Sequence, residues 1–264
     1  MDLSQLVVDL MASIIAGAAG GLAVKAGFDA MSRGWLSVQA SWFGPCVLVW
    51  SDLPANDESR LAARLRTKLG NVELVQLRSA AEFRRHPLNR RCVKCVILIV
   101  TDVTKIADDE HTRRDLESRL VAYVNNGGGL IGLHDAVYRR IGLDQLRQQF
   151  GCESTTYSPY SEPILYVRTR HAGRCPPFGQ MTETFSLDDG ELLKTSWVSD
   201  AVTIYETPDG TPLVVCRDLD SGRLVWLHSA NRGENGVASS IRNPDRQLIE
   251  LLKASIDWAG GERR

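Results

Sequence analysis

The segment "VNNGGGLIGLHDAV", residues 124–137, decides the predicted fold because it joins two kinds of secondary structure. Three consecutive glycines end a stretch with helical spacing, and the apolar run 130–133 follows them directly. Glycine commonly follows the end of a helix, and a short apolar run bounded by turn residues is typical of a buried strand. The segment therefore predicts a helix and then a strand, with His134 and Asp135 at the carboxyl end of that strand.

Strands and helices also alternate along the chain before this segment. Short apolar runs predict buried strands over residues 46–50, 72–77, 95–103 and 130–134. Helices are predicted between them over residues 57–70, where Leu61, Leu65 and Leu69 have helical spacing, and over residues 108–129. This alternation predicts a parallel sheet with helices on both faces.

The second half of the chain, residues 151–260, is rich in strands until its end. Strands are predicted over residues 162–169, 201–207, 211–218 and 222–229, with a turn at "PDG", residues 208–210. A closing helix begins after Asn243 and Pro244, because these residues are a favoured cap and first helical residue. We interpret residues 45–261 as one α/β domain in which the extra strands are inserted into, or extend, the same sheet.

The composition excludes some classes of function. The 264 residues carry a formal net charge of −1, so the chain lacks the basic excess with which proteins bind nucleic-acid phosphates. The six cysteines lie mostly in apolar runs, which is typical of buried, reduced cysteines. "CVKC", residues 92–95, has no second pair of ligands nearby, and a structural zinc site needs four. The sequence therefore predicts no metal and no cofactor.

Residues 6–24, "LVVDLMASIIAGAAGGLAV", are apolar apart from Asp9. Their number is close to the roughly 20 residues that span a bilayer as a helix. Small residues recur at every fourth position, and Gly17 and Gly21 form a GxxxG pair, a spacing that lets two helices approach closely.

We interpret residues 1–40 as a hydrophobic helix and connector that attaches the protein to a membrane or mediates self-association. A helix buried on the core of the domain is the alternative. If the segment spans the inner membrane, Lys25 and Arg33 place the α/β domain in the cytoplasm by the positive-inside rule.

Polar residues stand where the predicted parallel strands end. In open α/β sheets, ligands bind beyond the carboxyl ends of the strands. The residues expected at this edge are Ser51, Asp52, Thr101, Asp102, His134 and Asp135. His228 ends the strand predicted over residues 222–229 and is expected to approach the same edge. His134 is thus the centre of a candidate ligand site; the alternative is a structural histidine that hydrogen-bonds within a turn.

The stretch "LVAYVNNGGGLIGLHDA", residues 120–136, resembles the signature of the ThuA-like (trehalose utilisation) family. A weaker resemblance extends over residues 45–260. It is carried by "RTRHAG" with His171, "SLDDGELL" with Asp189 and Glu191, "DSGRLVWLHSAN", and "IDWAGG". The resemblance implies the three-layer, flavodoxin-like parallel-sheet sandwich of the class I glutamine amidotransferases, and a ligand related to carbohydrate. Residues 1–40 have no counterpart in the family.

The sequence departs from the resembled pattern at several positions. The amidotransferases carry a nucleophilic cysteine where this chain has His134, and no cysteine stands within three residues of it, so glutamine hydrolysis is not expected. Asn231 occupies a position where the family usually has histidine, and "FGCES", residues 150–154, lacks the histidine of the family's "GHP".

Two main hypotheses follow. The first is a non-catalytic module that binds or senses a carbohydrate-like ligand, or acts as a scaffold, attached to a membrane or an assembly by its N-terminal helix. The alternative is an enzyme that acts on a sugar derivative with His134 and strand-end carboxylates. The candidate binding residues are Ser51, Asp52, Asp102, His134, His171, Glu191 and Asn231, and the candidate catalytic residues are His134, Asp135 and His228.

Overall fold

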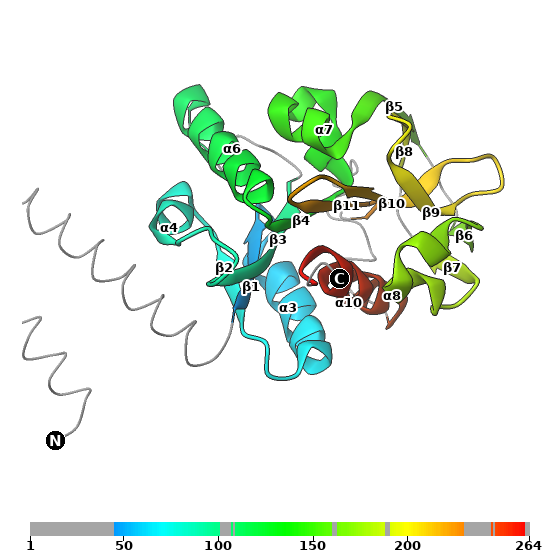
Figure 1. Ribbon diagram of the computed structural model, residues 1–264, viewed down its shortest axis with the longest axis horizontal. Helices are drawn as coiled ribbons and strands as arrows, with labels where there is room; N and C mark the ends of the chain where they lie inside the picture. The colour runs from blue at the N-terminus through cyan, green and yellow to red at the C-terminus, as the bar shows by residue number, and fades with distance from the viewer. Residues whose placement is uncertain are drawn as a thin grey trace, which may run out of the picture.

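The structure is a computed structural model (Figure 1). It describes residues 45–100, 107, 109–159, 163–187, 191–229, 244 and 246–261. The predictions for the N-terminal helix, Asp102 and Asn231 lie outside the described residues. None of the helices within these ranges is both long enough and apolar enough to cross a membrane.

The core of the fold is a nine-stranded mixed sheet with the strand order β2-β1-β3-β4-β11-β10-β9-β6-β7. Five neighbouring strands are parallel: β2 (Leu74–Leu77), β1 (Cys46–Ser51), β3 (Val93–Ile99), β4 (Gly129–Leu133) and β11 (Arg223–Leu227). The other four extend the sheet in antiparallel fashion: β10 (Pro212–Asp218), β9 (Val202–Glu206), β6 (Ile164–Arg168) and β7 (Thr184–Leu187). The predicted α/β class and the extension of the sheet by the second half are confirmed.

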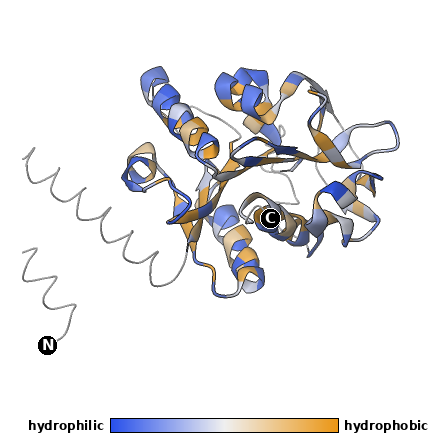
Figure 2. Cartoon of the chain, in the orientation of Figure 1, coloured by the Kyte–Doolittle hydropathy of each residue, from blue (hydrophilic) through white to orange (hydrophobic). Residues whose placement is uncertain are grey.

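Helices cover both faces of the sheet (Figure 1). One face carries α3 (Ala55–Leu69), α8 (Pro176–Gly179) and α10 (Arg246–Ala259); the other carries α4 (Ala80–Arg85), α6 (Glu110–Asn125) and α7 (Asp144–Phe150). Alternate side chains of β1 serve the two faces: Val47 and Val49 pack on the first, and Leu48 and Trp50 on the second. Apolar residues accordingly line the interior between the layers (Figure 2).

Several elements were not predicted from the sequence. β5 (Cys152–Pro159) and β8 (Glu191–Trp197) pair with each other as a separate two-stranded sheet instead of joining the main one. β5 reads "CESTTYSP", which has too few apolar residues to mark a buried strand. The helices α4 and α7, with six and seven residues, are too short to show a helical period.

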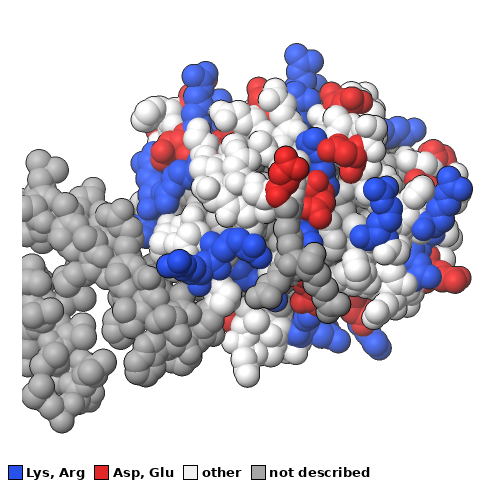
Figure 3. All heavy atoms as spheres, in the orientation of Figure 1, with Lys and Arg blue, Asp and Glu red and all other residues white. Residues whose placement is uncertain are grey.

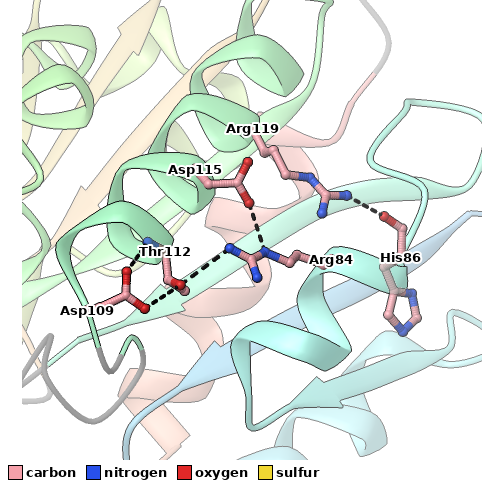
Figure 4. Close-up of polar contacts among 6 residues, drawn as sticks. All are labelled: Arg84, His86, Asp109, Thr112, Asp115 and Arg119. Carbon is pink, nitrogen blue, oxygen red and sulfur yellow. Dashed lines mark hydrogen bonds and ion pairs between the residues drawn. The ribbon is translucent and has the colours of Figure 1, made fainter. Parts of the chain in front are cut away.

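Hydrogen bonds connect the short helix α4 to α6 (Figure 4). Arg84 Nε donates to Asp115 Oδ2 over 2.9 Å, and Arg119 Nη2 donates to the carbonyl of His86 over 3.0 Å. Burial lowers the pKa of His86.

On the face shown in Figure 3, Lys and Arg are interspersed with Asp and Glu, so charges of both signs share this surface.

Candidate functional site

The candidate site lies at the carboxyl edge of two neighbouring strands. β4 and β11 are parallel, and Leu133 pairs with Leu227, so the residues that follow them lie side by side. His134 follows β4 and opens the short 3-10 helix η1 (His134–Val137), and His228 follows β11. Their ring centroids are 4.7 Å apart, and the rings meet edge to face at 60°. The structure thus brings together two histidines that are distant in the sequence.

His134 has a strained backbone. Its φ is +32°, and among the described residues no other residue except glycine has a positive φ. L side chains rarely adopt this region, and residues held there cluster at binding sites and active sites. The carbonyl of His134 accepts a hydrogen bond of 2.9 Å from the indole Nε1–H of Trp226. The turn after β4 is therefore held in its unusual conformation from the neighbouring strand.

Asp135 orients the imidazole of His134. The ring nitrogen Nδ1 lies 2.9 Å from Asp135 Oδ1. An ionised carboxylate only accepts hydrogen bonds, so Nδ1 carries the proton, and Nε2 of the neutral ring bears the lone pair. The His134 side chain is 1 % exposed and that of Asp135 is 15 % exposed. The pair is thus a buried imidazole whose orientation is set by the neighbouring carboxylate.

His228 has a different role because both of its ring nitrogens are engaged. The backbone N–H of Leu193 on β8 donates to Nε2 over 3.0 Å, so this nitrogen must bear a lone pair. Nδ1 therefore carries the proton and donates to the hydroxyl of Tyr166 on β6, 3.1 Å away. Burial holds the pKa of His228 well below its usual value, and the nearness of the second titratable ring, His134, acts in the same direction. His228 is a neutral ring that ties β11 to β6 and β8.

Ser51 and Asp52 lie at the same edge of the sheet, at the end of β1 and with β3 between them and β4. Ser51 is buried, and its Oγ accepts a hydrogen bond of 3.0 Å from the Leu53 N–H. The Asp52 N–H donates to the carbonyl of Ile99 over 3.2 Å. These contacts close the turn after β1.

The remaining candidates lie elsewhere or are only partly described. His171 is exposed and follows β6. The pairings from β11 through β10 and β9 to β6 are all antiparallel, so β6 runs opposite to β11 and ends at the other edge of the sheet. The structure therefore does not bring His171 to the two histidines. Glu191 begins β8, two residues before the amide that binds His228.

The residues that complete the site were missed in the sequence. Trp226 and Tyr166 stand in apolar runs and read simply as core residues. Their polar atoms gain a role only once β11 lies beside β4 and β6 lies near β11. Within the described ranges, no group of three or more His, Cys, Asp or Glu side chains could hold a metal ion. All six cysteines are unpaired.

Comparison with solved structures identifies the architecture. A structure described as a ThuA-like protein from Parabacteroides merdae aligns with a TM-score of 0.56 at 13% identity, over 82% of this chain and 90% of that one. A glutamine amidotransferase from Thermotoga maritima aligns with a TM-score of 0.55 at 9% identity, over 82% and 99%. The chain has the fold of the ThuA-like proteins and the glutamine amidotransferases.

A second ThuA-like structure, from Bacteroides uniformis, aligns with a TM-score of 0.53 at 12% identity, over 81% of this chain and 91% of that one. No family model and no curated protein matches the sequence. At these identities the similarity establishes the fold alone. In this chain His134 stands directly after β4, at the start of η1.

Proposed function

We propose that the edge formed by His134, Asp135 and His228 binds a small, polar, carbohydrate-like molecule, and that the domain is a ligand-binding or sensing module. The backbone of His134 carries the proposal. A left-handed conformation at a residue other than glycine is costly, and it persists where the surroundings enforce it. Here a buried indole holds the carbonyl, and a carboxylate fixes the ring. A histidine that only closed a turn would need neither.

Acid–base catalysis on a sugar derivative is the second candidate function. In this second function Asp135 would hold Nδ1–H, and Nε2 of His134 would take up a proton from a substrate hydroxyl. An adjacent carboxylate would also stabilise the imidazolium that forms. In this reading His228 is not the acid, because both of its nitrogens are engaged.

Ligand-dependent thermal stability tests the proposal. A panel of monosaccharides, disaccharides and sugar acids is added to the wild type, to His134→Ala and to His171→Ala, whose altered side chain is exposed and away from the edge. A compound at a hundredfold excess over its Kd stabilises the protein by about 2.7 kcal/mol, which raises Tm by several degrees. We expect the ligand to raise Tm of the wild type and of His171→Ala, and to leave Tm of His134→Ala unchanged.

Two results would contradict this proposal. One is a panel in which no compound raises Tm of the wild type. The other is a ligand shift that survives in His134→Ala while the variant itself loses about 1–3 kcal/mol of stability, as expected for a structural histidine. Chromatography of the active compound after incubation separates the two candidate functions, since only an enzyme consumes it.

We also propose that residues 6–24 attach this module to the inner membrane or to a second copy of the chain. The apolar length and the GxxxG spacing of this segment support the proposal. The full chain is expected in the membrane fraction or as an oligomer, and a chain without residues 1–40 is expected as a soluble monomer with the same ligand response. Fractionation and light scattering measure both. Full-length protein that is already a soluble monomer would rule out anchoring and assembly.

A further inference from the structure

Trp226 contacts the strained turn from the neighbouring strand. It is fully buried on β11 and pairs with Gly132 in the register of β11 and β4. From there its indole Nε1–H reaches past the end of β4 and donates to the carbonyl of His134. A Cβ at Gly132 would lie 2.8 Å from the Phe150 ring and 2.9 Å from Ala136, so β4 packs tightly beneath this turn. The hydrogen bond therefore fixes the one peptide of the turn whose conformation is unfavourable.

The indole is itself held in place by the rings around it. The Trp226 centroid lies 5.8 Å from that of His228 and 5.2 Å from that of Trp197 on β8. His228 cannot turn without losing its bonds to Tyr166 and Leu193. Trp226 is thus a rigid donor, and its N–H keeps its direction toward the His134 carbonyl.

We infer that Trp226 is a positioning residue of the candidate site, one that holds His134 in the conformation in which Nδ1–H meets Asp135. The carbonyl group and the side chain of His134 are attached to the same Cα. If the hydrogen bond from Trp226 is removed, φ of His134 can return to the favoured negative range, and the imidazole then moves with the backbone. The contact with Asp135, which sets the tautomer, is then lost. This inference rests on the proposed function for the purpose of the site, but the geometry of His134 can be measured without any ligand.

Trp226→Phe removes the indole N–H and keeps an aromatic ring in the cluster. Trp197→Phe is the matched control, because Trp197 belongs to the same cluster and its Nε1–H donates to Thr195 Oγ1 over 2.8 Å instead of to His134. Both variants lose one indole hydrogen bond and a similar amount of ring. Only the first releases the His134 carbonyl.

NMR of the full chain labelled with ring-¹⁵N histidine reports the tautomer directly. The signals of the five histidines are assigned with His134→Gln and His228→Gln. We expect a single Nδ1–H tautomer for His134 in the wild type and in Trp197→Phe, and a mixture of both tautomers in Trp226→Phe. For a compound that raises Tm of the wild type, Kd should increase about tenfold or more in Trp226→Phe and stay within about twofold in Trp197→Phe.

The outcomes separate the inference from the proposed function. An unchanged His134 tautomer in Trp226→Phe would overturn the inference, whether or not a ligand binds. If Trp226→Phe loses the single Nδ1–H tautomer of His134, the inference is supported. If the wild type binds none of the compounds, the proposed function is contradicted, and the inference is unaffected. If Trp226→Phe does not fold, benzothienylalanine at position 226 keeps the shape of the indole without its N–H, and the same spectrum decides.

Discussion

A Gly129→Ala substitution is expected to lower the free energy of unfolding by about 3 kcal/mol, near the upper end of the range for overpacked cores. Gly129 begins β4, and a Cβ there would lie 2.4 Å from the carbonyl oxygen of Ala259 and 2.6 Å from its carbon. These are backbone atoms at the end of α10, so no side chain can rotate away. Arg223 also fixes this end of the helix, because its Nη1 donates to the Trp258 carbonyl over 3.0 Å.

Equilibrium unfolding in urea measures this effect. Gly173→Ala is the control, since a Cβ at Gly173 meets nothing within 4 Å and its φ is not in the left-handed region. The control should change stability by less than about 0.5 kcal/mol. If Gly129→Ala were as stable as the wild type, the close packing between the end of α10 and the start of β4 would be contradicted.

The second large effect is a loss of stability in acid that depends on His228. The folded-state pKa of His228 lies well below its unfolded value of about 6.5, so below that pH the unfolded chain binds a proton that the folded protein does not. The contribution is fully present above pH 6.5 and is lost as the pH falls toward the folded-state pKa. One proton corresponds to about 1.4 kcal/mol per pH unit over the pH range in which only the unfolded chain is protonated.

His228→Gln isolates this contribution, because glutamine can accept the Leu193 N–H but does not titrate. The free energy of unfolding of both proteins is measured from pH 8 to pH 4.5. Below about pH 6.5 the slope of this free energy against pH should be smaller in the variant, by up to the contribution of one proton. Other groups are common to both proteins and cancel: His86 acts with the same sign, while burial raises the pKa of Glu58 and Glu117, which act with the opposite sign. Parallel curves would contradict a buried neutral His228.

The sequence by itself determined much of the parallel part of the sheet. The leucine spacing in α3, the apolar runs of β1, β3 and β4, and the glycines before β4 are local signals, because they report which side of a segment is buried and where it turns. The place of His134 directly after β4 followed from the same signals. They could not mark β5 and β8, whose pairing leaves much of both strands outside the main core.

Only the tertiary structure decided what surrounds His134. Its contact with His228 requires β11 to lie next to β4, and the choice of neighbour in a sheet depends on the packing of distant segments. The left-handed φ at a residue other than glycine has no local cause, since local preference disfavours it. It exists because the buried Trp226 holds the carbonyl and Asp135 holds the ring, and the first of these contacts crosses from one strand to the next. Periodicity in the sequence reports burial, whereas the direction of a buried N–H is fixed only when both strands are in register.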